Sequence, residues 1–133
     1  GVRLVGHRVD VDEWLAAADL VALPSRWEGM SIGMLEAMAR GRSIVATDVP
    51  GALEALDDDA GGVVPPEDPV ALADAIAVRL LDPELAAAEG RRARQRAEQA
   101  YDLDATTARI AEAYEQVLGA RSPVSSSTGP TSP

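Results

Sequence analysis

The 133-residue sequence contains no cysteine, no lysine and no phenylalanine, and it has a single histidine, His7. Without cysteine the chain cannot form disulfides, thiolate nucleophiles or cysteine-ligated zinc and iron–sulfur sites. Without lysine it cannot form a Schiff base or supply the phosphate-binding lysine of a P-loop. One histidine excludes a metal site built from several imidazoles. Because no cluster of ligands remains, we expect neither a metal nor another cofactor.

Long apolar runs and an excess of positive charge are also missing. No run of about 18 apolar residues occurs, so no transmembrane helix is expected, and no signal peptide is visible. The chain has 22 acidic and 12 basic residues and a net charge of −10, which argues against nucleic acid as a partner. With 47% hydrophobic and 26% charged residues, a globular class is expected, and the length indicates about one domain.

Apolar runs that stop at glycine or proline alternate with helical periodicity along the chain. Strands are predicted at residues 2–5, 20–23 and 43–47, with a brief one near 63–64. The run at 20–23 has the pattern of a strand buried on both faces. Helices are predicted at about 10–18, 31–40, 52–56, 69–80, 83–100 and 104–118. This alternation predicts an α/β fold with a parallel sheet, followed by C-terminal helices.

Several residues have the chemistry of helix ends. Ser31, Asp68 and Asp104 precede predicted helices as N-caps, Asp82-Pro83 restarts a helix, and Gly41 follows one as a stop. Residues 119–133 are mostly serine, proline, threonine and glycine and have almost nothing to bury. We therefore expect a folded domain over residues 1–118 and a disordered tail over 119–133.

The loop after the second predicted strand has the features of an anion site. Gly29 and Gly33 permit close approach of backbone to a ligand, and Ser31 can cap the helix that follows. The first turn of that helix presents unpaired N–H groups at its positive dipole end, which suits a phosphate. Glu28 lies before the helix and Glu36 lies on it. The loop thus offers an anion cradle between two carboxylates.

Glu36 is the residue of this helix that we expect to bind a diol. If Ile32, Leu35 and Ala39 form the buried stripe, Glu36 lies about 40° from Ile32, at the stripe's edge. A partly buried carboxylate there can accept hydrogen bonds from two hydroxyl groups, such as those of a ribose. The alternative is that Glu36 pairs with Arg40 one turn later on a solvated face.

Six segments of the chain together resemble the group 1 (family 4) retaining glycosyltransferases of GT-B fold. They are AADLVALPSRWEG at 17–29, EAMARG at 36–41, SIVATD at 43–48, GVVPP at 62–66, DPVALADAI at 68–76 and DPEL at 82–85. The family's hallmark is two glutamates separated by seven residues, after a strand that ends Pro-Ser, here Glu28 and Glu36. The resemblance spans about residues 2–118. It implies a Rossmann-like part of the C-terminal, donor-binding domain.

The resemblance also implies a role for each residue of the loop. Glu28 is the catalytic candidate, in contact with the donor sugar near the reacting centre, and Glu36 holds the ribose. The sugar hydroxyls and the distal phosphate fall to the backbone amides of Gly29, Met30, Ser31 and Ile32. The diphosphate faces Gly33, Met34 and Leu35. His7 and Arg8, after the first predicted strand, are candidates for contact with the base. Met30, Ser31, Ile32 and Gly33 depart from the family's usual Phe-Gly-Leu-Pro.

The implied function is transfer of a sugar from a nucleoside-diphosphate sugar to an acceptor hydroxyl with retention of configuration. The acceptor is left open as a glycan, a lipid or a small molecule. The location implied is cytoplasmic or peripheral at the inner membrane face, because Arg91, Arg92, Arg94 and Arg96 form a basic cluster, although a solvated face is favoured for it. The alternatives are a non-catalytic nucleotide- or partner-binding remnant and another GT-B enzyme such as a nucleotide-sugar epimerase.

In this family the sheet has the strand order 3-2-1-4-5-6, so residues 2–5 would be strand 3, at an edge. Strands 1 and 2, the acceptor domain, and the Arg and Lys that neutralise the diphosphate lie on elements that precede this chain. We therefore predict that the 133-residue polypeptide alone neither turns over a nucleotide sugar nor folds stably. Urea denaturation tests this: a cooperative transition with a free energy of unfolding above ~5 kcal/mol would refute it.

Overall fold

A computed structural model describes residues 1–56 and 59–119 of the chain. Its sheet has three parallel strands, β1 (Leu20–Leu23), β2 (Ser43–Thr47) and β3 (Gly61–Val64), in the order β1-β2-β3. The register pairs Leu20 with Ser43 and Thr47 with Val64. The predicted α/β class with a parallel sheet is confirmed.

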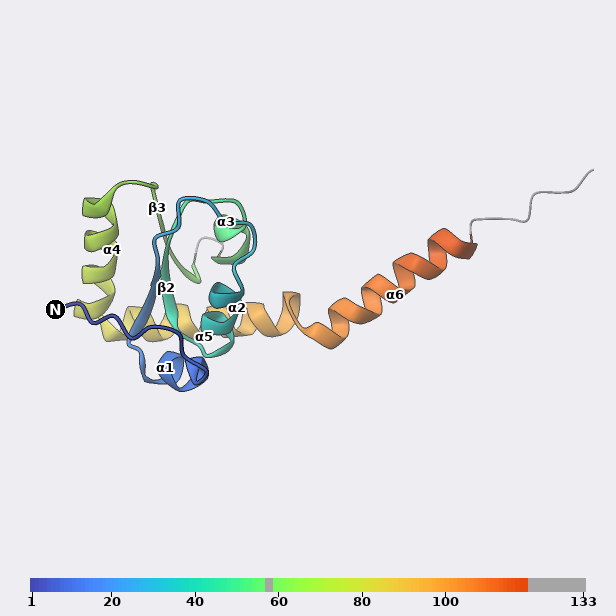
Figure 1. The fold of residues 1–133 in the computed structure, drawn as a ribbon, viewed down its shortest axis with the longest axis horizontal. Coiled ribbons are helices and arrows are strands. Elements are labelled where there is room, and N and C mark those ends of the chain that lie inside the picture. The colour runs from blue at the N-terminus through green and yellow to red at the C-terminus, as the bar shows by residue number, and fades with distance from the viewer. Residues whose placement is uncertain (57–58, 120–133) are drawn as a thin grey trace, which may run out of the picture. The chain divides into compact units, whose positions relative to one another are not determined.

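Helices cover both faces of the sheet (Figure 1). The helix α4 (Pro69–Leu81) lies on one face, whereas α2 (Ile32–Ala39) and α3 (Ala52–Leu56) lie on the other. The long helix α5 (Pro83–Ala100) passes across the end of the sheet where the strands begin, and α1 (Val11–Ala17) precedes β1. The carboxyl ends of the strands are thus left to the loops, which is where open α/β sheets bind ligands.

Most of the predicted caps are confirmed. The side chain of Asp68 accepts from the amides of the first turn of α4, and that of Asp82 accepts from the first turn of α5. Gly41 follows α2 with φ +65°, a conformation that glycine adopts without strain. One cap is wrong: Asp102, not Asp104, caps the next helix, through a 2.8 Å bond to the amide of Ala105.

The core is built on β2, all five of whose residues are buried. Helix α2 contributes Met34, Ala37 and Met38, and α5 contributes Ala93 and Ala97. Close packing of α5 requires Gly90, because a Cβ there would lie 2.1 Å from the carbonyl oxygen of Gly41. The small residues of α5 therefore let its backbone approach the turn between α2 and β2.

One strand prediction is wrong, and for another strand the predicted burial is wrong. Residues 2–5 form no strand, and the side chains of Val2 and Leu4 are almost fully exposed. A strand needs a neighbour to receive its backbone hydrogen bonds, and no described segment pairs with this one. The strand β1 is present but is only half-buried, with Ala22 exposed, because β1 is an edge of the described sheet.

The chain divides into two compact units, residues 1–101 and residues from Asp102 onward. The second unit contains α6 (Leu103–Gly119), so Gly119, expected to begin the tail, is the last residue of a helix. The rest of the predicted tail lies outside the described residues. The predicted domain of residues 1–118 spans the first unit and this helix.

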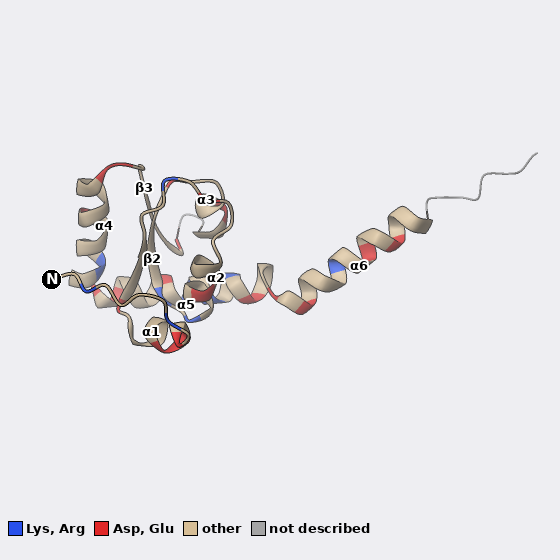
Figure 2. Cartoon of the chain, viewed as in Figure 1, with Lys and Arg blue, Asp and Glu red and all other residues tan. Residues whose placement is uncertain are grey.

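The four arginines of the basic cluster lie on α5, with Glu89 before them and Glu98 after them (Figure 2). Arg92 pairs with Asp59 at 3.2 Å, Arg94 pairs with Glu98 at 2.9 Å, and Arg96 donates to the carbonyl oxygen of Glu54. Three of the four guanidinium groups thus have partners within the chain. Among the described helices, none is both long and apolar enough to span a membrane.

A buried ion pair joins α4, α5 and β2. Arg79 donates to both carboxylate oxygens of Glu89, at 2.8 and 2.7 Å, and the hydroxyl of Ser43 donates to the same carboxylate at 2.5 Å. The exposed fractions of the two charged side chains are 10% and 6%. Gly62 makes room for this pair, because a Cβ there would lie 2.7 Å from the Arg79 guanidinium.

Removing one partner of this pair leaves a buried charge uncompensated. We expect Glu89→Ala in the complete gene product to lower the free energy of unfolding by about 3–5 kcal/mol. The double variant Arg79→Met/Glu89→Leu should recover most of that loss, because no buried charge remains. Denaturant unfolding of the single and double variants measures both effects. Equal losses in the two would contradict the assignment.

Candidate functional site

The site begins where the ladder between β1 and β2 ends. The last pair in register is Leu23 with Ala46, because Pro24 has no N–H to continue the ladder. The hydroxyl of Thr47, a buried residue, donates instead to the carbonyl oxygen of Ser25 and reaches that of Leu23 at 3.4 Å. This contact fixes the direction in which the loop leaves the carboxyl end of the sheet.

The turn that precedes α3 supports the site loop. Gly51 has φ +87°, and a Cβ there would lie 2.6 Å from the carbonyl oxygen of Gly29 and 3.3 Å from the Cα of Met30. The turn after β2 therefore packs directly against the backbone of the site loop. Only glycine satisfies both the conformation and the spacing at this position.

The start of α2 carries the confirmed cap. The hydroxyl of Ser31 accepts from the amide of Met34 at 3.4 Å, and its carbonyl oxygen accepts from the amide of Leu35 at 3.1 Å. Both of those amides are therefore already bonded, although they belong to the predicted diphosphate contacts. Met34 is also buried in the core, so its side chain faces away from solvent.

Five consecutive amides before them have no acceptor in the described parts of the chain. They belong to Gly29, Met30, Ser31, Ile32 and Gly33. A Cβ at Gly29 would meet nothing within 4 Å, and one at Gly33 would meet only the Ser31 hydroxyl, at 3.8 Å. The space above the loop is open, and unpaired N–H groups at a helix start suit an anion. That these amides hold an anion stays a prediction.

Glu28 lies half-buried at the start of this cradle. One of its oxygens, Oε2, accepts from the hydroxyl of Ser25 at 2.8 Å. Its other oxygen has no hydrogen-bond partner within residues 1–56 and 59–119. The carboxylate is thus held on one side and available on the other.

Glu36 is exposed, so the expectation that it is partly buried is wrong. The buried stripe of α2 consists of Met34, Ala37 and Met38, because those residues face β2 and α5. Ile32, which was expected in the stripe, is 73% exposed, and Glu36 shares its face. The Glu36 carboxylate can still accept hydrogen bonds from two hydroxyl groups, but because it is exposed no neighbouring side chain holds it in place.

The alternative for Glu36, a pair with Arg40, is not found in the structure. Arg40 pairs instead with Asp12 of α1, to which its Nε and Nη2 both donate. This guanidinium holds the pKa of Asp12 below its ordinary value. Glu36 therefore keeps its charge free of a partner among the described residues.

The two candidates for base contact lie in the segment before α1. His7 is exposed, and Arg8 is bound to Asp10, whose pKa it lowers. The Arg8 guanidinium also lies 5.4 Å from the centre of the Trp14 ring, a cation–π contact. No hydrogen bond or ion pair connects either residue to the cradle in the part of the chain that is described.

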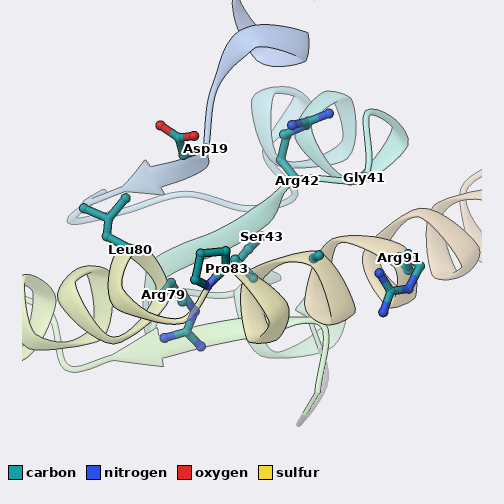
Figure 3. Close-up of a pocket in the computed structure, with 10 residues that line it drawn as sticks. Asp19, Gly41, Arg42, Ser43, Arg79, Leu80, Pro83 and Arg91 are labelled. Atoms are coloured by element: carbon teal, nitrogen blue, oxygen red, sulfur yellow. The ribbon is translucent and has the colours of Figure 1, made fainter.

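A cavity of about 600 Å³ lies at the opposite end of the sheet (Figure 3). It is lined by Asp19, Arg42, Ser43, Arg79 and Arg91 among others, and by none of the predicted site residues. Figure 3 shows the side chains of Arg42 and Arg91 directed apart rather than toward one point. The described residues contain no group of three or more potential metal ligands. The expected absence of a metal stays a prediction.

Ser25, Thr47 and Gly51 were not among the predicted site residues. Their contacts join loops that follow different strands, so local pattern does not reveal them. The signals available were a serine directly after a strand-ending proline and a glycine directly after Pro50. Both are common in turns and point to no ligand by themselves.

The fold and the loop together match a known family. The family model described as "Glycosyl transferases group 1" matches residues 1–82, and the chain belongs to this family. The structure matches solved GT-B glycosyltransferases. Among these is Alr3699/HepE of Anabaena in complex with UDP, with a TM-score of 0.81 at 30% identity over 84% of this chain and 31% of that one.

The curated relatives that the chain matches are also glycosyltransferases. The chain is 34% identical to a lipopolysaccharide core biosynthesis mannosyltransferase of Rhizobium meliloti, over 88% of this chain and 34% of that protein. It is 39% identical to a D-inositol 3-phosphate glycosyltransferase of Saccharomonospora viridis, over 78% of this chain and 24% of that protein. The chain thus spans about a third or less of the length of these relatives.

The close contact under the cradle gives a test of its support. We expect Gly51→Ala to lower the free energy of unfolding of the complete gene product by about 1–3 kcal/mol, because the new methyl group overlaps the Gly29 carbonyl. Gly6→Ala is the matched control, since Gly6 also has a positive φ, +67°, but a Cβ added there would meet nothing within 4 Å. Amide exchange at Gly29 should rise only in the first variant. Equal effects of the two would show that the loops do not depend on each other.

Proposed function

We propose that this chain carries the donor site of a glycosyltransferase that moves a sugar from a nucleoside diphosphate to an acceptor hydroxyl, with retention of configuration. The observation that carries the proposal is the run of five unpaired amides, from Gly29 to Gly33, between the carboxylates of Glu28 and Glu36. Such a run suits a diphosphate, and a carboxylate on each side suits the hydroxyl groups of two sugars.

The residues take roles in the order of the chain. Glu28 accepts hydrogen bonds from hydroxyl groups of the donor sugar, through the carboxylate oxygen to which Ser25 does not donate. The amides of Ser31, Ile32 and Gly33 bind the diphosphate. Glu36 accepts hydrogen bonds from the 2′- and 3′-hydroxyl groups of the ribose. The exposed position of Glu36 suits this role, because no cation among the described residues pairs with its carboxylate.

The reaction exchanges one bond at the anomeric carbon. The acceptor oxygen forms a new bond to that carbon, and its proton passes to the departing phosphate oxygen. The bond from the carbon to that phosphate oxygen breaks, its electron pair leaves with the nucleoside diphosphate, and negative charge grows on the diphosphate as it departs. Amides that are already oriented at the helix start stabilise that charge with no reorganisation, which is how fixed dipoles lower a barrier. No step requires a metal.

The relatives support the class of donor. The Anabaena protein is similar over most of this chain and has been solved with UDP and with UDP-glucose. We therefore take a nucleoside diphosphate as the ligand, and UDP is the first nucleotide to test. The acceptor stays a hydroxyl of a glycan, lipid or small molecule, since the elements that select it are expected outside this chain.

Nucleotide binding to the complete gene product tests the proposal. We expect one of UDP, GDP and ADP to bind, and Glu36→Ala to weaken that binding at least tenfold, because hydrogen bonds to a charged group contribute about 1.5–3 kcal/mol. Titration calorimetry of the three nucleotides with both proteins provides the measurement. Replacing the preferred nucleotide by its 2′-deoxy analogue should reduce the affinity less for the variant than for the wild type.

Glu13→Ala is the matched control, since Glu13 is an exposed helical glutamate on α1, away from the cradle. It should leave the dissociation constant unchanged. Equal affinity of wild type and Glu36→Ala would remove the ribose role. Failure of all three nucleotides to bind would reject the donor site itself.

A further inference from the structure

We infer that Ser25 is a positioning residue that sets the orientation of Glu28 in the donor site. The inference rests on the proposed function and adds to it a residue that contacts no substrate. Its basis is the single hydrogen bond from the Ser25 hydroxyl to Oε2 of Glu28, at 2.8 Å, and the way in which Ser25 is itself fixed.

Ser25 is anchored to the sheet although it lies in a loop. Its carbonyl oxygen accepts from the hydroxyl of Thr47, the last residue of β2. Thr47 is 5% exposed and pairs with Val64 of β3, so its own position is set by the middle of the sheet. The chain of contacts therefore runs from the buried strand through Thr47 and Ser25 to the Glu28 carboxylate.

Among the described residues, the bond from Ser25 is the one hydrogen bond that restrains the rotamer of Glu28. Within the described residues no cation pairs with it, and Ser25 is its only hydrogen-bond donor. The neighbouring side chain of Trp27 is 85% exposed, so it does not pack over the carboxylate. Without the hydroxyl of Ser25, the glutamate would sample several staggered rotamers, and only some of them face the cradle.

The hydrogen bond from Ser25 also gives the two carboxylate oxygens of Glu28 different partners. Oε2 is occupied by Ser25, which leaves Oε1 as the acceptor for the sugar. A carboxylate that rotates freely would lose the alignment that a reacting sugar needs, and small misplacements of a catalytic group reduce the rate strongly. Ser25 should therefore affect the chemical step and leave nucleotide binding unchanged, because the amides and Glu36 do not depend on it.

The test uses five versions of the complete gene product: the wild type, the variants Ser25→Ala, Ser25→Thr and Glu28→Ala, and the double variant Ser25→Ala/Glu28→Ala. Transfer is assayed with whichever of UDP-, GDP- or ADP-glucose is turned over fastest, and affinity is measured for the corresponding nucleoside diphosphate. Ser25→Ala should lower kcat at least tenfold while the dissociation constant changes less than twofold. Ser25→Thr keeps the hydroxyl and should keep most of kcat.

The double variant Ser25→Ala/Glu28→Ala separates positioning from a merely structural role. If Ser25 acts through Glu28, the serine substitution should reduce kcat less than threefold further in the Glu28→Ala background. Wild-type kcat in Ser25→Ala, or the same loss in both backgrounds, would overturn the inference. Full activity of Glu28→Ala would instead reject the catalytic role of Glu28 in the proposed function.

A structural readout does not depend on activity. In crystals of Ser25→Ala, the Glu28 side chain should occupy more than one rotamer, or move away from the cradle, while the backbone of residues 24–31 stays in place. A single Glu28 rotamer unchanged from that of the wild type would overturn the inference even if no sugar donor is turned over.

Discussion

The parallel ladder between β1 and β2 ends at Pro24, and the candidate site depends on how it ends. Proline cannot donate the next backbone hydrogen bond, so the hydroxyl of Thr47 takes over and donates to the loop. The chain then turns across the carboxyl edge of the sheet instead of continuing as a strand. Because of this turn, Glu28 and the unpaired amides at the start of α2 lie at the same edge.

The opposite edge of the sheet has a different character. There α5 crosses the amino ends of the strands, the carboxylate of Glu89 is fully engaged by Arg79 and Ser43, and Gly90 brings α5 close to Gly41. The buried charges at this edge are paired, whereas the amides of Gly29 to Gly33 at the carboxyl edge have no acceptor among the described residues. A rigid support beside open backbone donors is what a ligand site at the carboxyl edge requires.

Much of this architecture follows from local chemistry. Ser31, Asp68 and Asp82 cap helices as their positions indicate, and the buried run at β2 has the apolar pattern of a central strand. The exposure of Glu36 could not be predicted in this way. Which face of α2 is buried depends on the approach of α5, a helix more than forty residues later in the chain. Likewise, residues 2–5 have the pattern of a strand, but no described neighbour pairs with them.

The family assignment could be predicted because the two segments that contain the glutamates and four further segments keep their order and spacing. The support of the loop could not, since Ser25, Thr47 and Gly51 act through contacts between loops. The most direct test is a crystal structure of the complete gene product with UDP, GDP or ADP, whichever binds. The diphosphate should lie on the amides of Ser31, Ile32 and Gly33. A nucleotide bound instead at the amino end of the sheet, beside Arg42 and Arg91, would contradict the account.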